Sequence, residues 1–356
     1  MIPVLTLKRR FMNTVQSKKH TTTQADMHDT QSRQYTVSGN TALSKEWELN
    51  IPSIIHTSPL EFRKLTIHDR TWAAPILAAE DSLASDGCFG TFFLWGSAYG
   101  MTAARIDNRM IPKYSTKEGL FFSFPAGSGP LKPAILQMKR LSEQQGQPLL
   151  IRGMTEEQKN RLEKEFPAQF TFEEVRSSAD YIYEAEVLAG LGGKKLHNKR
   201  NHCNRFEQEC PDWRFEQLGK EHAKSCLDLL NSWEEDHSGQ EGGMAEAEKE
   251  AILTAFKHYD QLGLEGGVIY GGDRLLAFTL GEPVGRNGFD VRFEKADISV
   301  HGTYQMINRE FVRHLLKTHP GLRYINREED MGMENLRKAK ESYYPAFMLN
   351  KYAARW

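Results

Sequence analysis

The sequence has few of the features that mark a disulfide-stabilised, membrane-spanning or strongly charged protein. Its four cysteines form no CxxC pair and show no regular spacing, which argues for reduced thiols and against a disulfide framework. No apolar run approaches the roughly 18 to 20 residues that span a bilayer. The formal net charge is −1, so no global field draws the chain toward DNA or an anionic membrane. We therefore expect a soluble, cytoplasmic protein whose contacts with charged partners are local.

The chain has 356 residues, of which 39% are hydrophobic, enough for two cores of roughly 130 to 170 residues each. Residues 1–54 differ from the rest, because their first part is rich in Thr, Gln, Ser and Lys and shows neither a helical nor an alternating apolar period. We expect this N-terminal extension to be disordered. It lacks the apolar core of a secretory signal peptide.

Apolar periodicity predicts two similar halves. In residues 55–180 we expect strands at 62–67, 91–95, 102–110, 120–124, 148–153 and 170–175, and helices at 68–79, 130–145 and 155–166, the last of which starts with a Thr-x-x-Gln capping signal. In residues 212–356 we expect strands at 213–218, 288–297, 323–326 and 346–352, and a hairpin at 267–282 whose Gly271-Gly272-Asp273 turn joins two apolar strands. We expect helices at 220–236, 245–262, 303–317 and 333–343, the third with Ile307, Phe311 and Leu315 at four-residue steps. Residues 181–211 would join the halves through one helix at 183–209. Both orders fit an α/β or α+β architecture of mixed sheets flanked by helices.

A basic segment lies on this connection. Between Val187 and Phe206 the chain carries five lysines and arginines and no acidic residue. On a helix, Lys195, Lys199 and His202 fall on one face. The segment is either a solvated surface helix or a site for anions, such as the phosphates of a cofactor or a nucleic acid.

Three segments of the chain are distinctive: DYIYEAEVLAGLGGKKLHNKRNHCNRF, RFEKADISVHGTYQMINREF and YINREEDMGMENLRKAKESYYP. They resemble the C-terminal catalytic domain of bacterial phosphatidylglycerol lysyltransferases, and the order of elements resembles the GCN5-related N-acetyltransferase (GNAT) fold. The resemblance spans roughly residues 55–356 and implies tandem GNAT-like units that move an aminoacyl group from a charged tRNA to a lipid headgroup. Members of that family carry a multi-helix membrane domain ahead of this one, which the sequence does not show. The acceptor therefore stays open.

The GNAT fold implies a place for the chemistry. Its sheet splays beside the start of a helix, here the one that begins at Thr303, so that an activated carbonyl can lodge between two strands. The predicted catalytic residues lie at the end of the preceding strand and near the end of the last helix: Glu294, Asp297 and Tyr343. Glu294 could instead form a surface ion pair with Arg292. Tyr343 could be a core aromatic residue, with Tyr344 as the alternative proton donor.

Residues that bind the donor or its phosphates are expected on the connecting segment, at the start of the 303–317 helix and around the last helix: Lys194, Lys195, Lys199, Arg200, Gly302, Thr303, Tyr304, Asn326, Arg337 and Lys338. The acidic run Glu328 to Asp330 either neutralises the neighbouring basic helix or selects a cationic aminoacyl group. The histidines and cysteines of the connecting segment fit no common zinc site, so we expect no metal.

Three functions are consistent with these residues. The first is transfer of an aminoacyl group from aminoacyl-tRNA, with no cofactor required, to a lipid headgroup or another small amine or hydroxyl acceptor. The second is N-acyl transfer from acyl-coenzyme A, although His301 to Tyr304 offer one glycine where acetyltransferases carry a Gly-x-Gly or Gly-x-Ala pattern. The third is a non-catalytic module that binds a phosphorylated ligand. The first unit lacks a comparable polar cluster and is expected to be structural.

Overall fold

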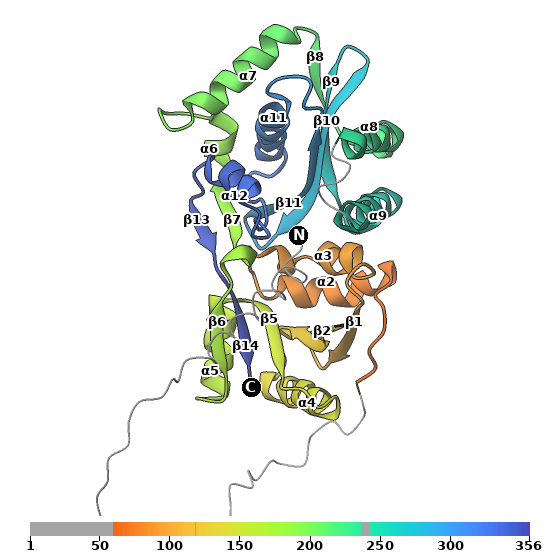
Figure 1. Ribbon diagram of the computed structural model, residues 1–356, viewed down its shortest axis with the longest axis vertical. Helices are drawn as coiled ribbons and strands as arrows, with labels where there is room; N and C mark the ends of the chain where they lie inside the picture. Colours follow the sequence, from red (N-terminus) through yellow and green to blue (C-terminus); the bar gives the residue numbers. More distant parts are fainter. Residues whose placement is uncertain (1–59, 118, 237–242) are drawn as a thin grey trace, which may run out of the picture.

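Two mixed sheets flanked by helices make up the computed structural model, which describes residues 60–117, 119–236 and 243–356 (Figure 1). The first sheet has the strand order β1-β2-β3-β5-β14-β6, and β4 pairs with β2. Its strands are β1 (Met101–Ile106), β2 (Arg109–Thr116), β3 (Gly119–Ser123), β4 (Ala126–Gly127), β5 (Leu150–Thr155), β6 (Thr171–Glu174) and β14 (Lys351–Arg355).

The second sheet has the order β13-β7-β12-β11-β10-β9-β8. Its strands are β7 (Asp180–Glu184), β8 (Trp213–Gln217), β9 (Glu265–Gly271), β10 (Arg274–Val284), β11 (Gly288–Ala296), β12 (Tyr324–Asn326) and β13 (Phe347–Leu349). Within the described residues, each sheet contains one parallel pair, β3 with β5 and β11 with β12. Beyond each parallel pair lie two further strands, β14 and β6 in the first sheet and β7 and β13 in the second. The predicted duplication of a mixed-sheet architecture is therefore confirmed.

Helices cover both faces of the second sheet (Figure 1). Apolar residues at the predicted four-residue steps of α11, among them Ile307 and Phe311, are buried with Ile269 and Phe289 of the sheet. On the other face α8 and α9 pack in a core shared with α2 and α3 of the first unit. The helices are α2 (Arg70–Ala78), α3 (Phe89–Trp95), α4 (Leu131–Gln144), α5 (Glu156–Glu165), α6 (Ala185–Gly190), α7 (His197–Glu209), α8 (Ala223–Asp236), α9 (Gly243–Lys257), α10 (Tyr259–Leu262), α11 (Thr303–Thr318) and α12 (Glu334–Glu341).

The two units exchange strands. β7 lies in the second sheet although it precedes the connection, and the C-terminal strand β14 returns to the first sheet between β5 and β6. Lys351, at the start of β14, is almost fully buried, and its amine lies 3.0 Å from Asp86 and 3.3 Å from Asp180. A buried lysine is stable only when it is paired, so these two ion pairs fix the point where the chain crosses between units. The division at residues 180/181 and 211/212 stays a prediction.

Several predicted elements are wrong. Residues 91–95 form the helix α3 rather than a strand, since an apolar run that is buried on all sides carries no period that separates the two. The single helix expected at 183–209 is β7, α6 and α7, and α6 ends at Leu191 in a left-handed conformation (φ 46°). The strand expected at 346–352 is two strands, one in each sheet. Residues 62–67 make only the bridge Arg63 to Ala103.

Two other expectations differ in what the structure says of them. The Thr-x-x-Gln cap of α5 is confirmed, because the Thr155 hydroxyl accepts from the Gln158 amide at 3.3 Å and the Gln158 side chain accepts from the Thr155 amide at 3.1 Å. The disorder expected for residues 1–54 concerns a segment outside the described residues. Within the described ranges, none of the helices combines the length and the apolar character needed to cross a membrane.

Candidate active site between strands β11 and β12

The second sheet opens between its two parallel strands. β11 and β12 pair only from Gly288 with Tyr324 to Asp290 with Asn326, while β11 continues to Ala296. A cleft of about 510 Å³ lies where the strands separate, next to the start of α11. Its walls carry Trp95, Lys199, Glu248, Val291, Arg292, Glu294, Lys295, Tyr304, Gln305, Arg327, Glu328, Glu329, Met331, Met333, Asn335, Leu336, Ala339, Lys340 and Tyr343. The predicted splay beside the helix at Thr303 is therefore present.

Glu294 and Arg327 form an ion pair in the wall of this cleft. The Glu294 Oε1 atom accepts from Arg327 Nη2 at 2.9 Å, and the two side chains are 11% and 15% exposed. The other carboxylate oxygen, Oε2, and the other guanidinium nitrogen, Nη1, are buried without a hydrogen-bond partner among the described residues. Buried polar atoms of this kind are normally satisfied. The pair thus offers an unused acceptor and an unused donor at the cleft, and Arg292 is not the partner of Glu294.

Tyr343 lies between two cations. The Lys199 amine is 4.1 Å from the centre of its ring, and the Arg327 guanidinium carbon is 5.0 Å away. Burial raises the pKa of the Tyr343 hydroxyl above its usual value. Burial, followed by the charge of Arg327, lowers the pKa of Lys199 from 10.5 to about 8. The two pKa values thus move in opposite directions, which suits Tyr343 as a proton donor and Lys199 as a proton acceptor. Tyr344 is half exposed, so Tyr343 is the tyrosine at the cleft.

A network of buried charges forms the floor of the cleft. Arg292 has no exposed side-chain surface and lies 2.9 Å from both Glu282 and Asp290. Burial is the first cause that raises the pKa of Asp290 to about 7. Arg292 also donates to the Thr91 hydroxyl on α3 at 2.7 Å, and Glu328 lies 3.7 Å away on the loop after β12. Because this network joins β10, β11, the β12 loop and α3, it holds elements of both units at the cleft.

The loop after β12 is held by a lysine. The buried Lys340 amine on α12 donates to the carbonyls of Arg327 and Glu329 at 2.6 and 2.5 Å. Glu328 between them has φ 56°, a left-handed conformation that is unusual for a residue other than glycine. Within the acidic run, Glu328 and Glu329 face the cleft, whereas Asp330 binds Arg337 and the Tyr181 hydroxyl instead.

Four of the predicted site residues on or next to β11, β12 and α12 do not line this cleft. Asp297 pairs with Arg274 and accepts from the Ser299 amide at 2.8 Å in a separate groove. The other three are Asn326, which is buried and donates to the Leu83 carbonyl at 2.7 Å; Arg337, which binds Asp330 at 2.9 Å; and Lys338, which pairs with Glu334 on the surface at 2.6 Å. The structure therefore does not bring Asp297 together with Glu294 and Tyr343.

The cations of the connecting segment have different environments. Lys199 lies in the cleft, Lys195 lies over the Tyr344 ring at 5.4 Å, and Lys194 is exposed. Arg200 donates to the Leu191 and Gly193 carbonyls, which caps the end of α6. The segment is thus neither a uniform anion site nor a fully solvated helix.

Gly302 and Thr303 have local structural contacts. Gly302 has φ 83°, and a Cβ atom there would lie 2.3 Å from the His202 carbonyl oxygen, so glycine lets α7 approach the start of α11. The buried Thr303 hydroxyl donates to the Val300 carbonyl at 2.7 Å. Tyr304 and Gln305, the next two residues, line the cleft. Donor binding at Gly302 and Thr303 stays a prediction.

The sequence did not lead us to Arg327 or Trp95. Arg327 directly follows β12. Because side chains alternate along a strand, Arg327 faces away from Asn326, which was the residue predicted to bind the donor. This alternation could have identified Arg327. Trp95 comes from the first unit, and no local pattern places it beside β11.

Comparison with known proteins identifies the family. Residues 79–355 match the family model described as phosphatidylglycerol lysyltransferase, C-terminal. The chain belongs to this family. A conserved protein of unknown function from Bacteroides thetaiotaomicron is 34% identical, and the match covers 83% of this chain and 99% of that one with a TM-score of 0.78. L-PGS from Bacillus licheniformis is 15% identical with a TM-score of 0.56, over 75% of this chain and 87% of that chain, which supports the fold.

An uncharacterised protein of Mycoplasmoides gallisepticum is 25% identical over 181 residues. The alignment covers 50% of this chain and 56% of the relative. Together with the strand order, the structural likeness shows that this member of the phosphatidylglycerol lysyltransferase C-terminal family has a tandem GNAT-like fold.

Proposed function

We propose that the cleft between β11 and β12 transfers an aminoacyl group from aminoacyl-tRNA to a lipid headgroup or another small acceptor with an amine or hydroxyl group. Family membership supports an acyl- or aminoacyltransferase. The observation that carries the proposal for this chain is the Lys199–Tyr343–Arg327–Glu294 arrangement at the open end of the parallel strand pair. It combines proton acceptors and donors with unused hydrogen-bonding atoms.

The proposed reaction is a direct attack. The acceptor's amine or hydroxyl attacks the ester carbonyl that joins the amino acid to the tRNA, a bond forms to the carbonyl carbon, and the bond to the ribose oxygen breaks. Lys199 takes the proton of the nucleophile, because its lowered pKa of about 8 leaves part of the amine neutral near that pH. Tyr343 donates a proton to the leaving ribose oxygen, since burial keeps its hydroxyl protonated.

The ion pair in the cleft wall orients the donor in this scheme. Arg327 Nη1 donates to the oxygen that becomes negative when the carbonyl is attacked, an interaction that is typically worth about 3 to 4 kcal/mol. Glu294 Oε2 accepts from the α-ammonium group of the amino acid. Both atoms are buried without a protein partner, so the ligand would supply the missing hydrogen bonds.

Two contacts favour RNA over coenzyme A as the donor. The backbone amide of Ser299, which could otherwise meet a phosphate, is already bonded to Asp297, and α7 closes on the start of α11 at Gly302. In contrast, the exposed Lys194 and the Lys195–Tyr344 pair leave cationic and aromatic groups on the segment that leads to Lys199. Such groups suit the phosphates and bases of a single-stranded acceptor end.

The test is a transfer assay with the purified chain, tRNA charged with radiolabelled lysine or alanine, and vesicles that contain phosphatidylglycerol. We expect Tyr343→Phe and Glu294→Gln to lower the rate about 100-fold or more, in line with the loss of a general acid or of a donor-orienting group. Lys338→Met is the control, because this side chain is 73% exposed and pairs with Glu334 on the surface.

Three outcomes would contradict the proposal. Stoichiometric binding and turnover of acyl-coenzyme A without RNA would make the chain an N-acyltransferase. Binding of charged tRNA with no transfer to any acceptor would make it a binding module. Equal rates for Tyr343→Phe and Lys338→Met would remove the cleft from the mechanism.

A further inference from the structure

One wall of the cleft between β11 and β12 is apolar. It consists of Met331 and Met333 on the loop after β12 and of Leu336 and Ala339 on α12. Leu336 and Ala339 are three residues apart, so they lie on the same face of the helix. The two methionines and Leu336 are half-buried, and within the part of the chain that the structure describes none of the four belongs to a hydrophobic core. This apolar wall therefore offers its surface to an occupant of the cleft.

The apolar wall lies within reach of the reacting groups. α12 ends at Glu341, and Tyr343 follows two residues later in the lining of the cleft. At a rise of 1.5 Å per residue, Ala339 lies about 6 Å and Leu336 about 10 Å along the helix axis from Tyr343. A side chain of four carbon atoms extends about 5 Å from its α-carbon. An amino acid whose carbonyl lies beside Tyr343 can therefore lay its side chain against this wall.

The charges in the cleft are balanced. Its charged lining residues are five cations and four carboxylates: Lys199, Arg292, Lys295, Arg327, Lys340, Glu248, Glu294, Glu328 and Glu329. Two of the carboxylates already lie 2.9 Å from cations, Glu248 from Lys295 and Glu294 from Arg327. The cleft thus has no excess of negative charge that would attract a cationic side chain.

The acidic run after β12 does not change this balance. Glu328 lies 3.7 Å from Arg292, and burial raises the pKa of its carboxyl well above the usual value, which reduces its negative charge. Glu329 is 2% exposed, and the buried Lys340 amine, which donates to its carbonyl, supplies a positive charge beside it. Of the two roles considered for this run, these contacts favour neutralisation of neighbouring cations over selection of a cationic aminoacyl group.

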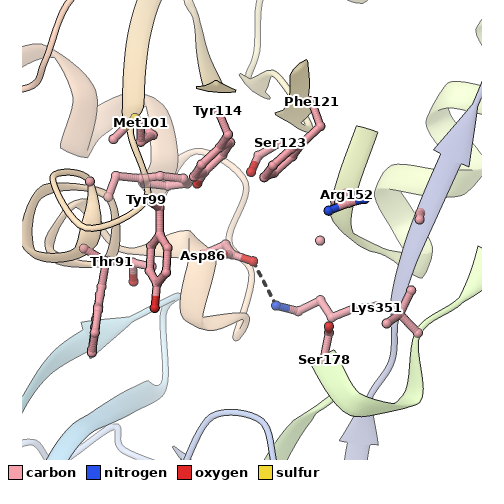
Figure 2. Close-up of a pocket in the computed structure, with 16 residues that line it drawn as sticks. Asp86, Thr91, Tyr99, Met101, Tyr114, Phe121, Ser123, Arg152, Ser178 and Lys351 are labelled. Atoms are coloured by element: carbon pink, nitrogen blue, oxygen red, sulfur yellow. Dashed lines mark hydrogen bonds and ion pairs between the residues drawn. The ribbon is translucent and has the colours of Figure 1, made fainter. Parts of the chain in front are cut away.

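The matching position in the first sheet is too small for an aminoacyl group. The cavity beside β3 and β5 measures about 80 Å³, against about 510 Å³ for the cleft. The Lys351 amine at this cavity is held by Asp86 (Figure 2). An engineered protein cavity that binds benzene measures about 150 Å³. The side chain of the donor therefore has its place in the second unit.

We propose that the apolar wall makes the cleft selective for aminoacyl groups with an uncharged, apolar side chain, and that Leu336 is a specificity-determining residue. In the proposed reaction Glu294 meets the α-ammonium group, so a second ammonium on the side chain would be buried without a carboxylate of its own, which is unfavourable. Methionine side chains adapt to apolar groups of different shapes. This inference rests on the proposed transfer function and names the class of its donor.

Binding of donor analogues that cannot react tests the proposal without turnover. In these analogues an amide bond joins the amino acid to 3′-amino-3′-deoxyadenosine, and calorimetry with the purified full chain compares the norleucine, lysine and alanine conjugates. Norleucine has the carbon chain of lysine without its ammonium group, and alanine lacks the chain. We expect the norleucine conjugate to bind about ten-fold or more tightly than either of the others.

Variants of Leu336 test its part in this choice. Leu336→Glu places a carboxylate in the apolar wall and should lower the ratio of norleucine to lysine affinity about ten-fold or more, since the ammonium group then gains a charged partner. Leu336→Met keeps an apolar side chain of similar volume and should preserve the ratio. Lys338→Gln is the matched control, because it changes the net charge by the same one unit on the same helix, at a side chain that is 73% exposed. Circular dichroism shows whether each variant is folded.

Lysine binding that equals or exceeds norleucine binding, or equal binding of norleucine and alanine, would overturn the proposal and leave the transfer function intact. An unchanged ratio in folded Leu336→Glu would overturn the role of Leu336. Displacement of the norleucine conjugate by dihexanoyl phosphatidylglycerol would assign the apolar wall to the acceptor and overturn the proposal as well. Binding of none of the three conjugates would contradict both this inference and the proposed donor. Norleucine preference without any transfer to an acceptor would support this inference and contradict the transfer function alone.

Discussion

Lys199 should destabilise the folded protein at neutral pH, and its replacement should reveal by how much. The amine lies in the cleft over the Tyr343 ring, and no carboxylate lies within ion-pair distance of it among the described residues. Burial and the neighbouring Arg327 charge lower its pKa from 10.5 to about 8. We therefore predict that Lys199→Met stabilises the protein near pH 7, in contrast to most substitutions at a buried position.

The magnitude follows from the pKa difference between the folded and unfolded states. A change from 10.5 to about 8 corresponds to about 3 kcal/mol at most, because one pKa unit equals about 1.4 kcal/mol. Below pH 8 the lysine is charged in both states, so the whole cost is present. As the pH rises from 8 to 10.5, the folded state loses its proton first, and the cost disappears. Partial exposure and the lost cation–π contact reduce the expected gain to about 2 kcal/mol.

Urea unfolding of the wild type and Lys199→Met at pH 7.0 and pH 9.5 measures this effect. The gain should fall by about 1 to 2 kcal/mol between the two pH values. Lys194→Met on the same segment is the control, since Lys194 is exposed and its replacement should change little at either pH. A gain that is the same at both pH values, or a loss at pH 7.0, would refute the reasoning and with it the role of Lys199 as a proton acceptor.

Two further predictions concern the segment that leads into the cleft. Of the five cations on the connecting segment, Arg200 is bonded to carbonyls, Arg205 is bonded to Glu209, and Lys199 lies in the cleft as the proton acceptor, which leaves two for RNA phosphates. Filter binding of charged tRNA should therefore give a slope of log K against log salt of about −1.4 to −1.8, and a slope near −4 would show that all five take part. Gly302→Ala should cost about 2 to 4 kcal/mol in thermal unfolding, because it combines left-handed strain with a clash against the His202 carbonyl. Gly193→Ala separates the backbone strain from the clash, because Gly193 has φ 76° but no atom lies within 4 Å of the new Cβ. This variant should cost about 1 to 2 kcal/mol. An equal loss of stability in both variants would exclude the clash at Gly302.

Periodicity predicted many of the helices and strands because its signal is local. The four-residue spacing of Ile307, Phe311 and Leu315 fixes the buried face of α11, and the glycine turn before Asp273 fixes the β9–β10 hairpin. Once β11 and α11 are placed, the opening of the sheet beside Thr303 follows from the resemblance to GNAT folds. Glu294 and Tyr343 then fall at the cleft because they lie near the ends of elements that border it.

What the sequence did not reveal depends on contacts between distant residues. The exchange of β7 and β14 pairs Lys351 with Asp180. No sequence pattern near either residue predicts this ion pair. The helix α3 was mistaken for a strand because its apolar residues are buried by residues of both units and so show no one-sided period. Asp297 was placed at the cleft because it ends the same strand as Glu294. Its carboxylate is drawn away by Arg274, a partner from the adjacent strand.

The same distant contacts explain why one unit cannot form this cleft alone. Trp95 in its wall comes from α3, and the Arg292 guanidinium on its floor donates to Thr91 of the same helix. Asn326, at the point where β11 and β12 part, donates to the Leu83 carbonyl of the first unit. Removing the first unit would leave these polar groups exposed or unpaired, and a buried charge that loses its partners destabilises its surroundings by several kcal/mol. The duplication therefore supplies the second unit with the rigid support that orients the residues of its cleft.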